Sequence, residues 1–92
     1  MHIDKVAKAG TLESNDILVM VMPARAPGVT LELESIVLKQ FGPQIREVIL
    51  NTVSALQVTA VHIKAQDRGA LDYAIAARVE AALRRGAQGG AP

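Results

Sequence analysis

Few side chains in this sequence have the types and the spacing that chemistry requires. The candidates are a serine inside the stretch AGTLESND, a histidine, two alternating glutamates and two adjacent arginines: Ser14, His62, Glu32, Glu34, Arg84 and Arg85. The chain contains no cysteine, which excludes disulfides, thiolate metal sites and a cysteine nucleophile. Any catalytic interpretation must therefore be built from these few groups.

Most of these candidates favour a structural interpretation. His62 lies on the polar side of an alternating segment, with no second histidine, cysteine or carboxylate cluster near it. We interpret it as an exposed strand histidine. Glu32 and Glu34 alternate with apolar residues, and although paired carboxylates can cleave glycosides, this pattern is the ordinary one for a solvated strand face. Arg84 and Arg85 suit the end of a helix. The sequence predicts no catalytic residue and no metal site.

Ser14 allows two interpretations. It stands between Glu13 and Asn15, and no base or metal ligand accompanies it. Serine is common in turns, where its hydroxyl bonds to the local backbone. The alternative is an accessible hydroxyl to which another group is attached. The residue types alone leave both open.

Composition narrows the functional classes. The chain has 92 residues, half of them hydrophobic, but Phe41 and Tyr73 are its only aromatics, and its net charge is +1. These values argue against a nucleic-acid binder, which needs stacking side chains or a basic surface. No stretch is apolar and long enough for a signal core or a membrane span, so we expect a cytoplasmic protein. We expect one domain over residues 1–85 and a flexible tail over residues 86–92.

Four segments are expected to be strands. Residues 3–10 form a weak strand or arm that ends at Gly10, and residues 17–22, ILVMVM, are apolar at every position and predict a strand buried on both faces. Residues 29–34 alternate cleanly and predict a strand with one wet face that continues to residue 38. The Pro27-Gly28 turn before it suggests a hairpin with residues 17–22. Residues 58–65 alternate again.

Two segments have helical spacing. The first begins at Gly42-Pro43, with proline at the first helical position, and runs to residue 56. The second follows the turn Asp67-Arg68-Gly69 and ends with a cap at residue 86; it includes an i,i+4 pair of a glutamate and an arginine at 80 and 84. The order β-β-β-α-β-α predicts an α+β fold, with an antiparallel sheet of about four strands and two amphipathic helices packed on one face.

Three blocks of the sequence resemble the citrate lyase acyl carrier protein family, also called the gamma subunit. AGTLESND resembles its Gly-Ser/Thr-Leu-Glu-Ser-x-Asp stretch, VLKQFGPQIREVIL its Lys-Gln-Phe-Gly-x-Gln-Ile-Arg block, and DRGALDYAIAARVEAAL its Asp-Lys/Arg-Gly-Ala-Leu-Asp block. Together they cover nearly the whole chain. The sequence departs from the family at Tyr73, where a cysteine is usual, and at Pro43, where a charge is usual; we assign Tyr73 no role.

The resemblance implies a covalent cofactor and a site for it. Members of the family carry 2′-(5″-phosphoribosyl)-3′-dephospho-CoA, joined to a serine through a phosphodiester, and Ser14 is the matching position. The group ends in a thiol that holds acetyl. We expect Glu13 and Asp16, which flank the serine, to help the modifying enzyme recognise the site; the alternative is that they only solvate a turn.

The resemblance also implies partners and a role in citrate fermentation. The alpha subunit of the lyase exchanges acetyl for citrate, and the beta subunit cleaves the citryl thioester to oxaloacetate. A prosthetic-group transferase and an acetate-loading ligase act on the carrier, which is not an enzyme on its own. Two other hypotheses stay open: a carrier for citramalate lyase, and an unmodified α+β module that binds partner proteins.

Overall fold

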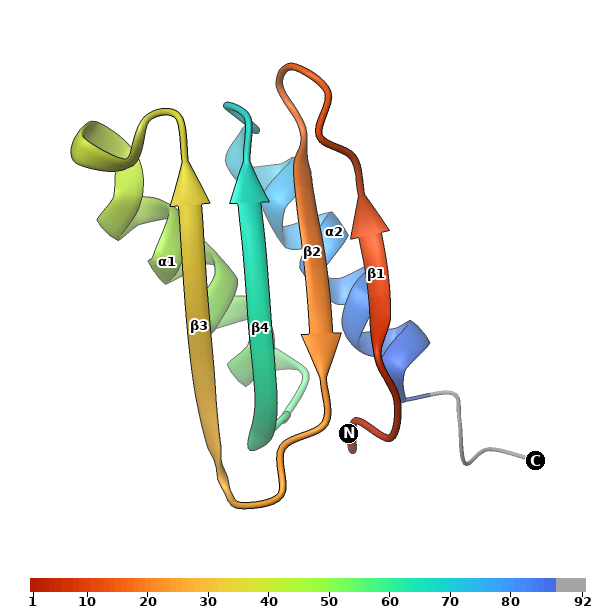
Figure 1. The fold of residues 1–92 in the computed structure, drawn as a ribbon. Helices are drawn as coiled ribbons and strands as arrows, with labels where there is room; N and C mark the ends of the chain where they lie inside the picture. Colours follow the sequence, from red (N-terminus) through yellow and green to blue (C-terminus); the bar gives the residue numbers. More distant parts are fainter. Residues whose placement is uncertain (88–92) are drawn as a thin grey trace.

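Four strands form one sheet, and two helices cover one of its faces (Figure 1). The computed structural model describes residues 1–87. The elements are β1 (Ala7–Gly10), β2 (Ile17–Met22), β3 (Gly28–Ser35), α1 (Leu38–Ala55), β4 (Ala60–Asp67) and α2 (Asp72–Gly86). The predicted α+β class, the order of the elements and the placement of both helices on one face are confirmed. Within residues 1–87, neither helix combines the length and the apolarity that a membrane span requires.

The sheet is mixed, whereas the sequence predicted an antiparallel one. Its strand order is β1-β2-β4-β3, and β2 runs antiparallel to both of its neighbours, but β3 and β4 are parallel. The 18-residue helix α1 lies between β3 and β4 in the sequence and carries the chain back to the end of the sheet where β3 began. A connection of that kind makes the next strand parallel to the one before it.

The predicted hairpin between β2 and β3 is also wrong, because β4 lies between these two strands. The segment around Pro27 therefore crosses the end of β4 instead of making a tight turn. Gly28 N donates to Thr59 O at 2.7 Å, which joins the start of β3 to the residue that precedes β4. The central position of β4 buries its inward residues completely, as a strand flanked on both sides allows: Val61, Ile63 and Ala65.

The hydrophobic core lies between the sheet and the two helices. The odd-numbered residues of β2 point into it and are buried, while the even-numbered ones are only half-buried. The prediction that residues 17–22 are buried on both faces is therefore wrong. Leu18, Met20 and Met22 lie on the face of the sheet that neither α1 nor α2 covers. The exposed even-numbered residues of β3 share that face, which confirms the prediction of one wet face for this strand.

Helix α1 begins at Leu38, about one turn before the predicted start at Gly42-Pro43, and β3 ends three residues before Leu38. The first turn forms around Val37, whose carbonyl accepts a 2.9 Å hydrogen bond from Phe41 N. Leu38 Cδ1 lies 3.0 Å from where a Cβ of residue 42 would be, so the Leu38 side chain packs across the bare glycine. Pro43 consequently lies inside the helix, where its missing N–H leaves one helical hydrogen bond unmade.

Helix α2 ends beside the beginning of the chain. Asp4 N and Lys5 N both donate to Gly86 O, at 2.9 and 3.2 Å. Arg84 Nε donates to Glu80 Oε2 at 2.9 Å, which confirms the predicted i,i+4 pair. The start of the chain and the end of α2 therefore lie together, at the end of the sheet opposite the β1–β2 loop (Figure 1). The tail predicted over residues 86–92 falls, apart from its first two residues, outside the described residues.

Candidate functional site

Ser14 lies in the loop that joins β1 to β2, at the end of the sheet where β4 leads into α2 (Figure 1). We call residues 11–16 the serine loop. Ser14 is exposed, and Asn15 after it has a left-handed backbone with φ of 64°. In the part of the chain that the structure describes, the side-chain hydrogen bonds of this loop are made by its threonine and aspartate, and none involves the Ser14 hydroxyl. The hydroxyl is therefore accessible from solvent.

Backbone hydrogen bonds tie the serine loop to the turn that follows β4. Asn15 N donates to Arg68 O at 2.8 Å, and Arg68 N donates in return to Asp16 O at 2.9 Å. Asp16 N donates to Glu13 O at 3.2 Å, which closes a turn around Ser14. Because backbone groups on both sides of Ser14 are bonded, the chain has one defined path through this residue.

Gly10 sets the point at which β1 turns into the serine loop. Its φ is +93°, a conformation that residues with a side chain rarely adopt. A Cβ at this position would lie only 1.8 Å from Ile17 O and 3.3 Å from Arg78 Cδ. Only glycine therefore allows the two ends of the loop to approach this closely.

Asp16 joins the serine loop to helix α2. Arg78 of α2 donates from Nε to Asp16 Oδ1 at 3.1 Å and from Nη2 to Oδ2 at 2.9 Å, a bidentate ion pair. Thr11 Oγ1 donates to Oδ2, and Ile17 N donates to Oδ1, both at 2.7 Å. The hydrogen bonds from Arg78, and then that from Thr11, lower the pKa of Asp16 to about 2. With donors on both oxygens, Asp16 shapes the loop; its recognition by a modifying enzyme stays a prediction.

We expect this ion pair to make the stability of the protein depend on acid pH. The pKa of Asp16 is about 2 in the folded protein and ordinarily 3.8. The charged Asp16 carboxylate therefore contributes its full stabilisation at pH values above the ordinary pKa, and this contribution is lost as the pH falls through about 2. Urea unfolding between about pH 5 and pH 2 should show a steeper loss of stability in the wild type than in Arg78→Ala. Arg85→Ala, on the same helix, should follow the wild type; parallel curves for wild type and Arg78→Ala would contradict the assignment.

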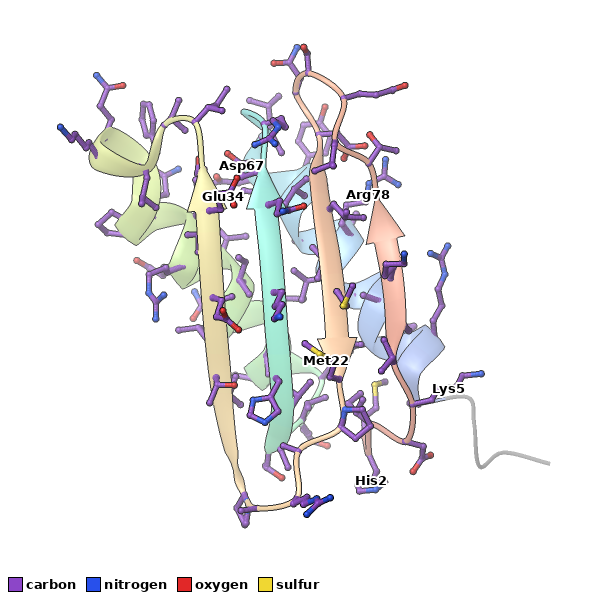
Figure 2. All side chains as sticks on the ribbon, viewed as in Figure 1. His2, Lys5, Met22, Glu34, Asp67 and Arg78 are labelled. Carbon is purple, nitrogen blue, oxygen red and sulfur yellow. The ribbon has the colours of Figure 1, made fainter. Side chains whose placement is uncertain are left out.

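Asp67 holds the turn on which the serine loop rests. It is completely buried, and it is the only buried charged residue of the described chain. Ser35 Oγ donates to its Oδ2 at 2.8 Å, and Gly69 N and Ala70 N donate to its two oxygens at 3.1 and 3.0 Å. Figure 2 shows Asp67 and Arg78 toward the same end of the sheet. The carboxylate of Asp16 thus holds the serine loop, and the carboxylate of Asp67 holds the turn after β4.

Glu13 is the other flanking residue singled out from the sequence. It is exposed beside Ser14, and its backbone N donates to Thr11 Oγ1 at 3.2 Å. Its carboxylate is therefore the acidic group of the serine loop that a partner can reach most directly, since the carboxylate of Asp16 is turned toward Arg78.

The remaining candidates lie away from Ser14 or have structural partners. His62 is exposed on β4, as predicted, and its Nδ1 is hydrogen-bonded to Thr30 Oγ1 on the neighbouring strand. Glu32 is exposed on the same face, and Glu34 pairs with Arg68 at 3.8 Å. Among residues 1–87, no group of three or more His, Asp or Glu side chains is arranged to hold a metal ion.

Sequence reasoning missed three residues of this site: Thr11, Arg78 and Asp67. Thr11 and Asp16 are close enough in sequence for their contact to have been anticipated as a local turn. Arg78 lies on a helix that was predicted from its helical spacing, its glutamate–arginine pair and its terminal arginines, and none of these features connects Arg78 with a loop so far away along the chain. Asp67 was predicted as the first residue of a turn, but it is the last residue of β4, and its burial depends on the parallel pairing of β3 with β4.

The family of the chain follows from similarity over nearly its whole length. A family model described as malonate decarboxylase delta subunit (MdcD) matches residues 4–86. A citrate lyase acyl carrier protein of Halothermothrix orenii is 51% identical over 89 residues, which cover 97% of this chain and 94% of the relative. That of Streptococcus mutans is 51% identical, covering 96% of this chain and 86% of the relative. The protein of the same name from Klebsiella pneumoniae is 47% identical, with 96% and 89% covered.

A solved structure supports the fold independently. One chain of the crystal structure of a Pseudomonas malonate decarboxylase hetero-tetramer in complex with malonate superposes with a TM-score of 0.75. The match covers 92% of this chain and 91% of that one. Because the two sequences are only 18% identical, the match shows the fold alone. The relatives are named as acyl carrier proteins of citrate lyase and not as catalysts. The chain belongs to the citrate lyase acyl carrier protein family.

Proposed function

We propose that this chain is the acyl carrier subunit of a citrate lyase, and that Ser14 carries 2′-(5″-phosphoribosyl)-3′-dephospho-CoA through a phosphodiester. The observation that carries the proposal is the exposed Ser14 hydroxyl on a loop whose backbone is bonded on both sides of it. The relatives named citrate lyase acyl carrier protein favour citrate as the acid. A citramalate carrier stays the alternative, because the residues around Ser14 do not distinguish the two acids.

The chemistry required of the protein itself is small. In attachment, Ser14 Oγ forms a bond to a phosphorus atom of an activated donor, the bond from that phosphorus to its leaving group breaks, and the hydroxyl proton departs. The described residues place no base on the Ser14 hydroxyl, so the transferase must accept this proton. Once attached, the group supplies a thiol that holds acetyl or citryl. The chain contributes an accessible attachment point and a fixed loop around it.

The proposed role needs several partners in turn. These are the alpha subunit, which exchanges acetyl for citrate; the beta subunit, which cleaves citryl; the prosthetic-group transferase; and the ligase that loads acetate. Tethering the acyl group to a small body raises its effective concentration at each of these active sites. We place the protein in the cytoplasm, where these enzymes would meet it.

Glu13 and Asp16 are proposed to guide the transferase in different ways. Glu13 offers an exposed charge beside Ser14, whereas Asp16 acts through the shape of the loop, since its carboxylate is engaged by Arg78. Glu13→Gln should slow attachment without changing the unfolding midpoint, because it removes only a solvent-exposed charge. An unchanged rate of attachment would leave Glu13 as a solvating residue of the turn.

Replacing Ser14 by alanine is expected to abolish attachment. The protein should be co-expressed with and without an active prosthetic-group transferase, and its intact mass and its peptide map measured. The wild type should gain the mass of one phosphoribosyl-dephospho-CoA on the peptide that contains Ser14. Ser54→Ala, which removes an exposed serine of α1, is the matched control and should be modified like the wild type.

Two outcomes would overturn the proposal. No mass gain in the wild type with an active transferase would remove Ser14 as an attachment site, and an unmodified interaction module would become the better reading. A mass gain that persists in Ser14→Ala would place the group elsewhere in the chain.

A further inference from the structure

An apolar hollow opens between the start of α1 and the turn that leads from β4 into α2. Its volume is about 430 Å³, within the range of roughly 300–1,000 Å³ that is usual for sites of small organic groups. The apolar residues that line it come from α1, from the residue before α1 and from the turn that leads into α2: Val37, Phe41, Ile45, Ala70 and Leu71. Two small residues of the turn, Gly69 and Ala70, line the hollow beside Leu71 and occupy little of its space.

Large apolar side chains at the rim of the hollow are exposed to an unusual degree. Phe41, the only phenylalanine of the chain, is 48% exposed, and Leu71 is 61% exposed. Ile36, in the turn before α1, is 67% exposed. Such exposure loses the free energy that burial of these side chains would give, so a cluster of them around a hollow indicates a surface that is covered part of the time.

The hollow is continuous with the serine loop. Gly69 lines the hollow, and the position of a Cβ on it would lie 3.6 Å from Asn15 Oδ1 and 4.0 Å from Ile36 Cδ1. The residue before it, Arg68, exchanges the two backbone hydrogen bonds with the serine loop. Asn15 directly follows Ser14. Ser14 therefore directly precedes a residue whose side chain lies close to Gly69 at the edge of the hollow.

The rim of the hollow also offers polar groups. Gln44 Nε2 lies 3.1 Å from both carboxylate oxygens of Asp72 and donates to them across the gap between α1 and α2. Both residues are exposed and line the hollow. The Gln44 side-chain carbonyl and the Asp72 carboxylate are acceptors suited to amide N–H groups, while the interior is suited to methyl and methylene groups.

We infer that this hollow binds the pantetheine-type end of the group attached to Ser14 between its visits to partner active sites. The inference rests on the proposed function. A chain that alternates amides with methyl and methylene groups matches an apolar interior with acceptors at its rim. Because the group is tethered beside the hollow, even weak contacts keep it there for much of the time. The terminal thiol is thereby shielded from solvent when no partner is present.

The test compares the unmodified protein with the protein modified on Ser14, both as the full chain without partners. Backbone and side-chain NMR signals of Phe41, Gln44, Ala70 and Leu71 should shift on modification, in addition to those of the serine loop. The terminal thiol should react with iodoacetamide on the order of 3- to 10-fold more slowly than in modified Ala70→Trp, in which the indole fills the hollow. Modified Ala77→Trp, with the same substitution at an exposed position of α2, should react like the wild type.

The outcomes separate this inference from the function on which it rests. Absence of the added mass on Ser14 would overturn both. A complete mass gain with NMR shifts confined to residues 11–16 would overturn the hollow alone and keep the carrier. NMR shifts around the hollow that appear only when a lyase subunit is added would show that the hollow binds a side chain of that subunit. This outcome would also overturn the inference. If Ala70→Trp does not fold, the NMR comparison of the wild-type forms decides.

Discussion

Replacing Gly10 by alanine is expected to destabilise the protein severely and to slow attachment at Ser14. An alanine Cβ would lie 1.8 Å from Ile17 O, a backbone atom of a residue paired with Asp67 of β4, so it can move only if the start of β2 shifts against β4. The positive φ adds strain of its own. We expect a loss of about 3 kcal/mol or more in the free energy of unfolding, which lowers the melting temperature of a domain of this size by ~12 °C or more. Thermal and urea unfolding measure it directly.

Gly28 provides the matched control for this prediction. It also has a positive φ, of +131°, but a Cβ there would meet nothing within 4 Å. Gly28→Ala therefore carries backbone strain without a collision and should cost about 1 kcal/mol, with attachment at Ser14 unchanged. Equal losses in the two variants would show that the conformation of Gly10, and not the close approach of Ile17, limits this position.

Replacing Asp67 by alanine is expected to have the second largest effect. The substitution removes the acceptor of three hydrogen bonds and leaves Ser35 Oγ, Gly69 N and Ala70 N without it. Because Asp67 is completely buried, water does not replace the carboxylate easily, and we expect a loss of about 3 kcal/mol. The turn that bonds to the serine loop should loosen, so attachment at Ser14 should slow as well. Urea unfolding and the mass-based assay of attachment give the two readouts.

Ser35→Ala separates the contributions to this network. It removes one of the three donors and should cost about 1 kcal/mol, with little effect on attachment, because the two backbone bonds of the turn to Asp67 remain. If Ser35→Ala slowed attachment as much as Asp67→Ala, the strand end and not the turn would be the support of the serine loop.

The elements could be predicted from the sequence where a local pattern decides them. The bounds of β2 follow from its apolar run and the proline after it, and α2 follows from its apolar stripe and terminal arginines. The start of α1 was misplaced, because the packing of Leu38 across Gly42 is a contact that a proline rule does not contain. The antiparallel sheet was wrong because a helix between β3 and β4 requires a parallel return, which the order of the elements already implied.

The site could be predicted in part for the same reason. Ser14 and its loop between two strands follow from local residues, and so does the turn at Asp67-Arg68-Gly69. That these two loops bond to each other depends on the pairing of β2 with β4, which alternation alone does not give. The salt bridge from Asp16 to Arg78 depends in addition on the rotation of α2 over the sheet. Long-range partners of this kind become visible only when the fold is known.

The meeting of the chain's beginning with the end of α2 has a practical consequence. Residues 4 and 5 bond to Gly86, and this junction lies at the end of the sheet opposite the serine loop. An affinity tag or a surface linker joined before residue 1 or after α2 is therefore attached at the end of the molecule opposite Ser14. A carrier immobilised through either end would expose Ser14 on the side that faces away from the surface. Different enzymes could then be added one after another to the same immobilised protein, and the action of each on the attached group measured in turn.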